Sequence, residues 1–145
     1  MFKPQTVAAA AAFACLGLAF PAQAACTGPT AGPSLNQTQL TALLTGNTVC
    51  AMRSTDRWQE LHVSGGDLID FKRGPGHAVD PSESVGRWSI VGNGAANATV
   101  LYNYGGSGGT FTFQVFAVSG NAYSFCAAGA AELPVTVKPG GGACP

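Results

Sequence analysis

Apolar and polar residues alternate along most of the chain from Asn47 onward. A period of two is the pattern of β-strands that bury one face. Glycine-rich turns interrupt the alternation about every ten residues, a spacing typical of all-β sandwiches and barrels. The alternation predicts strands over residues 48–53, 58–63, 68–73, 85–91, 98–104, 110–118, 122–126 and 134–138.

The connections between these strands carry the residues that tight hairpins need. Glycine recurs in the connections at 64–66, 92–94, 105–109 and 119–121, and it supplies the positive φ of tight antiparallel turns. Short connections without a second helical pattern predict an all-β fold, a single antiparallel meander. We expect the meander to close into a small barrel of seven or eight strands, because closure removes its exposed edges.

One short N-terminal helix is expected ahead of the strands. Asn36 and Gln39 are spaced as an N-cap and its capping-box partner, and Gly46 is placed as the glycine that ends a helix. Leu40 and Leu44 belong to one apolar face. We expect this helix to plug or cover one end of the sheet.

The same alternation predicts which side chains point inward. An eight-stranded barrel has an interior that side chains just fill, or that holds one small ligand. We expect a filled interior, which leaves recognition to the loops. The expectation rests on six inward aromatic side chains: Trp88, Tyr102, Tyr104, Phe111, Phe113 and Phe125.

The first 24 residues have the features of a secretory signal peptide. Lys3 precedes an apolar run from Val7 to Phe20, and a small-x-small site follows at 22–24. The run is too short to span a bilayer, which takes about 20 residues. We therefore expect residues 1–24 to be the signal and 25–145 to be one disulfide-stabilised barrel domain. The expected location is periplasmic or secreted, with no transmembrane segment in the mature chain.

Four cysteines remain after the signal: Cys26, Cys50, Cys126 and Cys144. An even number in an exported chain predicts two disulfides, and four cysteines allow three pairings. Strand parity turns Cys50 and Cys126 outward on the first and a late strand, which favours Cys50–Cys126 and leaves Cys26–Cys144. Lipidation of Cys26 is the alternative use of that residue.

Charge excludes some partners and points to one region. Without Lys3 the chain holds six basic and seven acidic residues, so we expect no nucleic acid or anionic membrane as partner. Eleven of these thirteen charges lie between Arg53 and Arg87, a region that we call the charged wall. The alternative is that the first three strands are simply the more solvated side of the sheet.

The connection at 72–81 is the one long loop of the meander. It carries both signs of charge, a histidine and two prolines, and long loops in small domains are often functional. If the chain binds a partner, the candidate residues are Lys72, Arg73, His77 and Asp80. A plain connection across one end of a barrel is the competing interpretation.

No catalytic or metal-binding motif stands out. His62 and Glu60 share a strand face with Trp58, but two distant histidines are a weak metal signal. We therefore expect His62 to be an ordinary surface histidine, and expect neither a metal nor a cofactor. There is no nucleophile motif. A hydrolase built on Glu60, Asp70 and His77 stays an alternative without positive support.

Three short segments carry a resemblance to known proteins. They are residues 43–50 with Leu-x-Gly-Asn-Thr, residues 85–90 with Gly-x-Trp, and residues 123–126 with a final cysteine. Over residues 40 to 127 the chain resembles small exported proteins of proteobacteria, and in architecture it is similar to calycin-like barrels. The resemblance implies no catalytic residue, and likeness of fold implies no function.

The expected function is therefore binding. We expect an exported protein of the bacterial envelope that recognises a protein or saccharide partner through the charged wall and the 72–81 loop. The alternative is a lipocalin-like carrier of a small apolar ligand. That alternative requires an interior cavity of roughly 300 Å³ or more.

Overall fold

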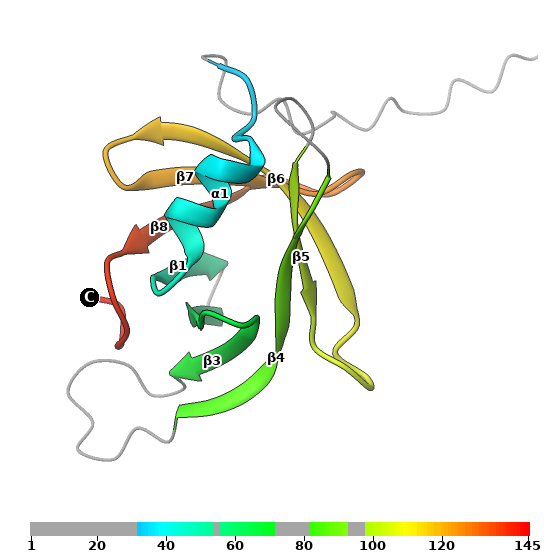
Figure 1. Ribbon diagram of the computed structural model, residues 1–145, viewed down its shortest axis with the longest axis vertical. Coiled ribbons are helices and arrows are strands. Elements are labelled where there is room, and N and C mark those ends of the chain that lie inside the picture. Colours follow the sequence, from blue (N-terminus) through cyan, green and yellow to red (C-terminus); the bar gives the residue numbers. More distant parts are fainter. Residues whose placement is uncertain (1–31, 54–55, 72–81, 93–97) are drawn as a thin grey trace, which may run out of the picture.

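The strands of the protein form one closed antiparallel barrel (Figure 1). The computed structural model describes residues 32–53, 56–71, 82–92 and 98–145. Each strand pairs with the next along the chain, and the last pairs with the first. The predicted all-β meander, its closure and its single short helix are thereby confirmed. The strands are β1 (Thr48–Arg53), β2 (Asp56–His62), β3 (Asp67–Phe71), β4 (Ser82–Val91), β5 (Thr99–Asn103), β6 (Thr110–Ser119), β7 (Ala122–Cys126) and β8 (Leu133–Lys138).

Strand register determines which side chains face the interior. Ala51 of β1 is paired with Trp58 of β2 and with Val135 of β8, and directly opposed residues share a face of the sheet. Trp88 of β4 is paired with Tyr102 of β5 in the same way. These residues belong to one apolar cluster inside the barrel, so the alternation in the sequence identified the core correctly.

Helix α1 (Gln37–Leu44) closes one end of the barrel. The Asn36 side chain accepts from the Gln39 backbone N–H at 2.9 Å, and the Gln39 side chain accepts from the Asn36 N–H at 2.9 Å. This is the predicted capping box. Leu40 and Leu44 are fully buried in the barrel core. At the helix end, Gly46 N–H donates to the His62 carbonyl at 2.7 Å, which ties the helix to the end of β2.

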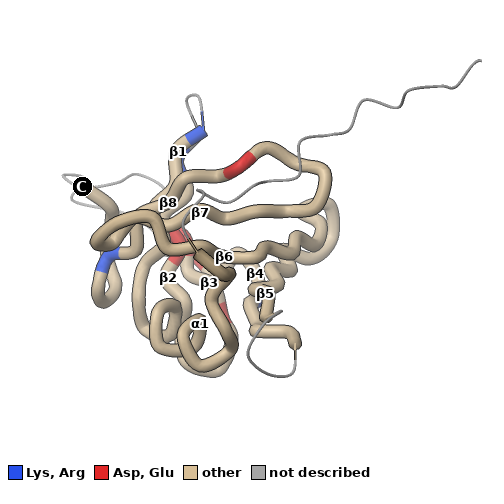
Figure 2. Tube along the Cα trace, turned by 90° about the horizontal axis from the view of Figure 1, so that it is seen from above, with Lys and Arg blue, Asp and Glu red and all other residues tan. Residues whose placement is uncertain are grey.

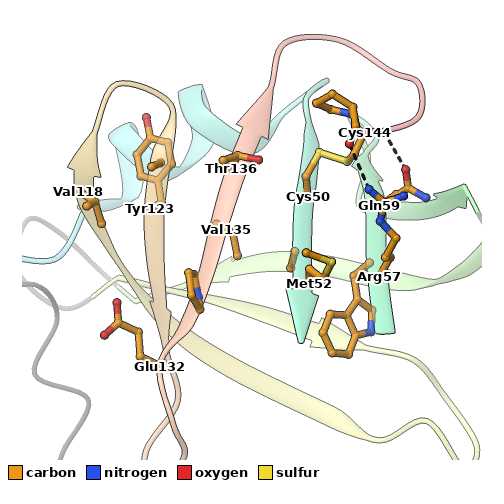
Figure 3. Close-up of a pocket in the computed structure, with 15 residues that line it drawn as sticks. Cys50, Met52, Arg57, Gln59, Val118, Tyr123, Glu132, Val135, Thr136 and Cys144 are labelled. Carbon is orange, nitrogen blue, oxygen red and sulfur yellow. Dashed lines mark hydrogen bonds between the residues drawn. A yellow bond between two sulfur atoms is a disulfide. The ribbon is translucent and has the colours of Figure 1, made fainter. Parts of the chain in front are cut away.

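The C-terminal tail after β8 crosses the outer face of β1 and β2 (Figure 3). Cys144 forms a disulfide with Cys50, with the two Cα atoms 5.9 Å apart. The backbone N–H of Cys144 donates to Gln59 Oε1 at 2.7 Å, and Arg57 Nη2 donates to the main-chain oxygen of Pro145 at 3.2 Å. Covalent and hydrogen bonds together hold the tail against the barrel.

The expected pairings of Cys50 with Cys126 and of Cys26 with Cys144 are both wrong, because Cys50 and Cys144 are bonded to each other. Strand β8 lies between β7 and β1, and Thr136 is the β8 residue that faces both Cys50 on β1 and Ala122 on β7. Cys126 is therefore one strand and four residues away from the position beside Cys50. Cys126 is disulfide-bonded, and its partner lies outside the described residues, because Cys50 and Cys144 are bonded to each other.

Several expectations fall on parts of the chain that the structure does not describe. These are the signal peptide over 1–24, the start of the domain at 25, Cys26 and the 72–81 loop. Within the described ranges, no helix has the length and apolar character needed to cross a membrane.

Candidate functional site

A cavity of about 230 Å³ opens at the barrel end opposite α1. We call it the mouth cavity. One carboxylate, Glu60, lies among its aromatic rings, and the rim includes Arg53 and Glu132. The lining residues are Val49, Ala51, Arg53, Trp58, Glu60, Tyr102, Tyr104, Phe111, Phe113, Phe125, Ala130, Ala131, Glu132, Leu133 and Val135.

Strand β2 brings Glu60 into the barrel. Trp58, Glu60 and His62 alternate with outward residues, and the pairing of Trp58 with Ala51 places this set inside. Glu60 is 7 % exposed and its neighbour across the β2–β3 ladder is Asp70. An ionisable carboxyl group therefore lies in a largely apolar interior.

Tyr104 is the described hydrogen-bond partner of the Glu60 carboxylate. Its hydroxyl donates to Oε1 and Oε2, each at 2.9 Å. Burial raises the pKa of Glu60 from its ordinary 4.5 to about 7, the bond from Tyr104 lowers it, and the charge of Asp70 raises it. Glu60 therefore changes its charge near neutral pH. Burial, with the nearby Glu60 charge, raises the pKa of Tyr104, so this phenol remains a donor.

His62 lies deeper in the barrel and is fully buried. Its Nδ1 is 3.0 Å from the Glu60 backbone carbonyl, which only accepts, so Nδ1 carries the proton. Its Nε2 is then an acceptor, and the Tyr102 hydroxyl donates to it at 2.8 Å. Burial lowers the pKa of His62 to about 4, and the ring is neutral. The expectation of a surface histidine is wrong, because the face shared with Trp58 is the interior.

Aromatic rings form a continuous wall of the mouth cavity. Tyr104 stacks on Tyr102 at 6.3 Å between centroids and meets Phe111 edge-on at 6.0 Å. Phe113 lies 5.8 Å from Tyr102 and 5.8 Å from Phe125. The inward aromatic set was predicted correctly, but it does not fill the barrel. Phe111 is 47 % exposed at the rim and leaves the mouth open.

Three carboxylates lie side by side across the strands at this end. Register pairs Glu60 with Asp70 and Asp70 with Glu83, so the three side chains share one face of β2, β3 and β4. Figure 2 shows acidic positions beside the labels of β2 and β3. Among the described residues, no group of three or more His, Cys, Asp and Glu residues could hold a metal ion.

The binding residues expected from the sequence lie outside the described residues. These are Lys72, Arg73, His77 and Asp80. The loop that carries them leaves β3 at Phe71 and returns to β4 at Ser82, and these two residues are paired at the mouth end. The hydrolase alternative requires Glu60, Asp70 and His77 to converge. Glu60 and Asp70 are neighbours across the β2–β3 ladder, whereas His77 lies outside the described residues.

The described residues of the charged wall do not share one face. Glu60 points into the barrel, whereas Asp67 accepts from Arg87 on the outside at 2.6 Å. The described charges of this region are therefore divided between the outer surface and the barrel interior. A sequence feature other than this cluster of charges indicates the mouth cavity. Tyr104 and Phe111 flank the glycine-rich turn at 105–109, so they lie at a barrel end.

A second hollow of about 490 Å³ lies on the outer face, between the C-terminal tail and strands β1, β2, β7 and β8 (Figure 3). Met52, Val118 and Pro134 give it an apolar floor. Its two charged side chains among the described residues, Arg57 and Glu132, are exposed. This outer groove lacks the buried ionisable group that distinguishes the mouth cavity.

Comparisons with known proteins found no matching family model, no matching curated protein and no matching solved structure.

Proposed function

We propose that this protein is an exported binding protein of the bacterial envelope, and that the mouth cavity is its recognition site. The cavity receives a small ligand or one protruding group of a protein or saccharide partner. The 72–81 loop is joined to the barrel at this same end through Phe71 and Ser82, which agrees with a role for the loop in binding. The proposal does not include catalysis.

The position of Glu60 carries this proposal. A carboxylate buried among apolar side chains costs free energy unless it is well compensated, and here one described hydroxyl donates to it. The fold does not need a charge at this position, because glutamine would accept the same bond from Tyr104 without the charge. Residues that reduce stability in this way are concentrated at functional sites.

The size of the cavity argues against a lipocalin-like carrier. Its volume of about 230 Å³ is below the roughly 300 Å³ at which typical ligand pockets begin. The hydrolase alternative depends on His77, which lies outside the described residues. His62 does not take its place, because its two ring nitrogens are engaged by the Glu60 carbonyl and the Tyr102 hydroxyl. Neither nitrogen is available as a general base.

Blocking the mouth tests the proposal. Ala131 is exposed and lines the cavity, whereas Ala128 is exposed in the same turn and does not line it. We would measure the Tm of wild type, Ala131→Trp and Ala128→Trp with a panel of small amines, alcohols, carboxylates and monosaccharides. A bound ligand raises Tm.

At least one class of probe is expected to raise the Tm of wild type and Ala128→Trp but not that of Ala131→Trp. The proposal is overturned if no probe raises the Tm of wild type, or if Ala131→Trp responds as wild type does.

A further inference from the structure

We infer that the group held in the mouth cavity is a small organic cation, a primary or quaternary ammonium, seated between the Glu60 carboxylate and the aromatic wall. This inference rests on the proposed function and adds the chemical class of the ligand.

The first support is the Glu60 carboxylate at the back of the cavity, which would hold the ligand. Glu60 offers two acceptor oxygens, and Tyr104 supplies one proton that both of them share. No described Lys or Arg forms an ion pair with this carboxylate, although Arg53 lies on the cavity rim. In a site of low dielectric, an ionised carboxylate attracts a cation strongly and repels an anion. The Glu60 carboxylate therefore selects for positive charge.

The second support is the aromatic wall. Tyr104, Phe111 and Phe113 line the cavity together with Trp58 of β2. The faces of aromatic rings carry negative potential and attract ammonium groups, including quaternary ones that cannot donate hydrogen bonds. The carboxylate and the rings thus favour the same kind of ligand.

Other ligand classes fit less well. Sugars carry many hydroxyls, each of which loses its bonds to water on burial. The buried polar side chains of the cavity wall are Glu60 and Tyr102, with Tyr104 and the indole of Trp58 half-buried, and the Tyr102 proton is already given to His62. An anion would meet Glu60, with Asp70 beside it and Glu132 on the rim.

Volume limits the size of the cation. A cavity of about 230 Å³ has the volume of about seven or eight water molecules in the liquid. Choline, with its trimethylammonium head and short hydroxyethyl arm, has seven non-hydrogen atoms and suits this volume as a probe. Its neutral carbon isostere, 3,3-dimethyl-1-butanol, has nearly the same shape without the charge.

Affinity for a cation is expected to depend on pH. The charged and titratable groups that face Glu60 or the cavity are Asp70, Tyr104, Arg53 and Glu132, with Tyr102 and His62 behind them. Burial places the pKa of Glu60 at about 7, so the carboxylate is about one-tenth ionised at pH 6 and about nine-tenths at pH 8. Because the cation binds the ionised form, choline should bind up to about tenfold more tightly at pH 8 than at pH 6.

Isothermal titration calorimetry with choline and 3,3-dimethyl-1-butanol tests the inference at both pH values. The variants are Glu60→Gln, which keeps the shape and the Tyr104 bond, and Phe111→Ala, which removes a half-exposed ring at the rim. Asp67→Asn is the matched control, since it makes the same chemical change on the outer face. We expect choline to bind wild type and Asp67→Asn at least about tenfold more tightly than the isostere, and Glu60→Gln and Phe111→Ala to bind it more weakly.

The outcomes separate this inference from the proposed function. If the isostere binds as tightly as choline and Glu60→Gln leaves the affinity unchanged, the inference of a cationic ligand is overturned, whereas the proposed small-ligand site remains. The same holds if only neutral or anionic probes of the panel bind at the mouth. If no probe binds, or if Ala131→Trp leaves binding unchanged, both are overturned.

Discussion

Glu60 and His62 lie two residues apart on the inner face of β2, and burial shifts their pKa values in opposite directions. The pKa of Glu60 rises from 4.5 to about 7, and the pKa of His62 falls from 6.5 to about 4. In both cases the interior disfavours the charged form of the side chain. The two shifts therefore make opposite contributions to the dependence of stability on pH.

The signs follow from proton binding. Between pH 4.5 and 7 the folded protein keeps the Glu60 proton that the unfolded chain releases, so this group makes stability fall as pH rises. Between pH 4 and 6.5 the unfolded chain binds a His62 proton that the folded protein does not, so this group makes stability rise with pH. Each contribution is on the order of 3 kcal/mol, so in wild type the two largely cancel between about pH 4.5 and 6.5.

We predict that Glu60→Gln uncovers the His62 contribution. In this variant the free energy of unfolding should rise from pH 4 to 6.5 by about 3 kcal/mol, because the His62 contribution is no longer offset by that of Glu60. Urea unfolding at a series of pH values measures it. His62→Gln should show the opposite slope, a fall between pH 4.5 and 7. Parallel pH profiles for wild type and both variants would contradict the prediction.

Parity in the sequence placed Trp58, Glu60 and His62 on one face of a strand, but it did not say which face. The outward set on β2 includes Leu61, which is as apolar as an inward residue. Carboxylates and histidines are mostly found at the surface, and that general tendency favoured the wrong side for His62. Pairing with Ala51 resolves the ambiguity, and this pairing is visible only in the folded barrel.

At the scale of the helix and strands, the capping box of α1 is the feature that the sequence encoded most directly. Asn36 and Gln39 each satisfy a backbone N–H of the other residue. Such local signals need no knowledge of the rest of the fold, which is why the start of the helix was predictable.

Asn36→Ala should lower the free energy of unfolding by about 1 kcal/mol, because an exposed helix end loses the acceptor for its first turn. Thermal or urea unfolding measures the loss. Thr38→Ala, two residues further along in the first turn and exposed, serves as the control and should change stability by much less. An equal loss in the two variants would show that the cap contributes nothing specific.

Strand β4 passes very close to β5 at Gly86. A Cβ at this position would overlap the backbone carbonyl oxygen of Asn103 and would lie 3.0 Å from Tyr104 Cα. Both neighbours are main-chain atoms at the end of β5, and Asn103 is paired with Arg87, so it does not move without breaking the β4–β5 ladder. Gly86 therefore maintains the spacing that brings Tyr104 to the cavity.

Gly86→Ala should destabilise the barrel by about 1–3 kcal/mol, as overpacking against fixed atoms does. Ser89→Ala, on the exposed side of the same strand, is the control. Urea unfolding compares the two. A Gly86→Ala protein as stable as wild type would mean that β4 and β5 separate easily at this point.

The predicted bounds of β1 and β7 agree with the structure, whereas β4 begins at Ser82, three residues earlier than expected. A shift in register between Leu68 and Ile69 lies opposite this part of β4. This shift adds one residue to β4 and so reverses the alternation of its side chains. Glu83 and Gly86 therefore both face inward, although their positions in the sequence differ by an odd number. Period-two analysis fails where a bulge changes the period.

At the scale of the whole molecule, closure of the meander was predictable and its consequences for the cysteines were not. Alternation and short turns indicate a barrel without specifying which strand closes it. The pairing of β8 with β1 separates Cys126 from Cys50 and brings the tail that carries Cys144 across β1. The mouth cavity could not be predicted either, because the sequence shows how many aromatic rings point inward but not how they are oriented.

The Cys50–Cys144 disulfide joins residues 94 positions apart. Replacing both cysteines with alanine should lower the free energy of unfolding by about 4 kcal/mol, since a long cross-link restricts the unfolded chain. Equilibrium and stopped-flow urea experiments measure the stability and both rates. Because the effect acts on the unfolded state, we expect the loss to appear mainly as slower folding.

Arg57→Ala is the control for this experiment. It removes the hydrogen bond to Pro145 but leaves the disulfide in place, so it reports the contribution of tail contacts alone. If Arg57→Ala costs as much as the double alanine variant, tail packing and not the cross-link stabilises the barrel.

The bond between Cys50 and Cys144 also has a consequence for damage to the backbone. Strands β2 to β8 all lie between the two sulfurs in the sequence. A protease that cuts once at an exposed turn such as Gly120 therefore produces two fragments that remain one covalent molecule. Each fragment is still paired with the other along the ladder on both sides of the cut. A single nick should thus be visible only after reduction, and the nicked barrel should keep its shape.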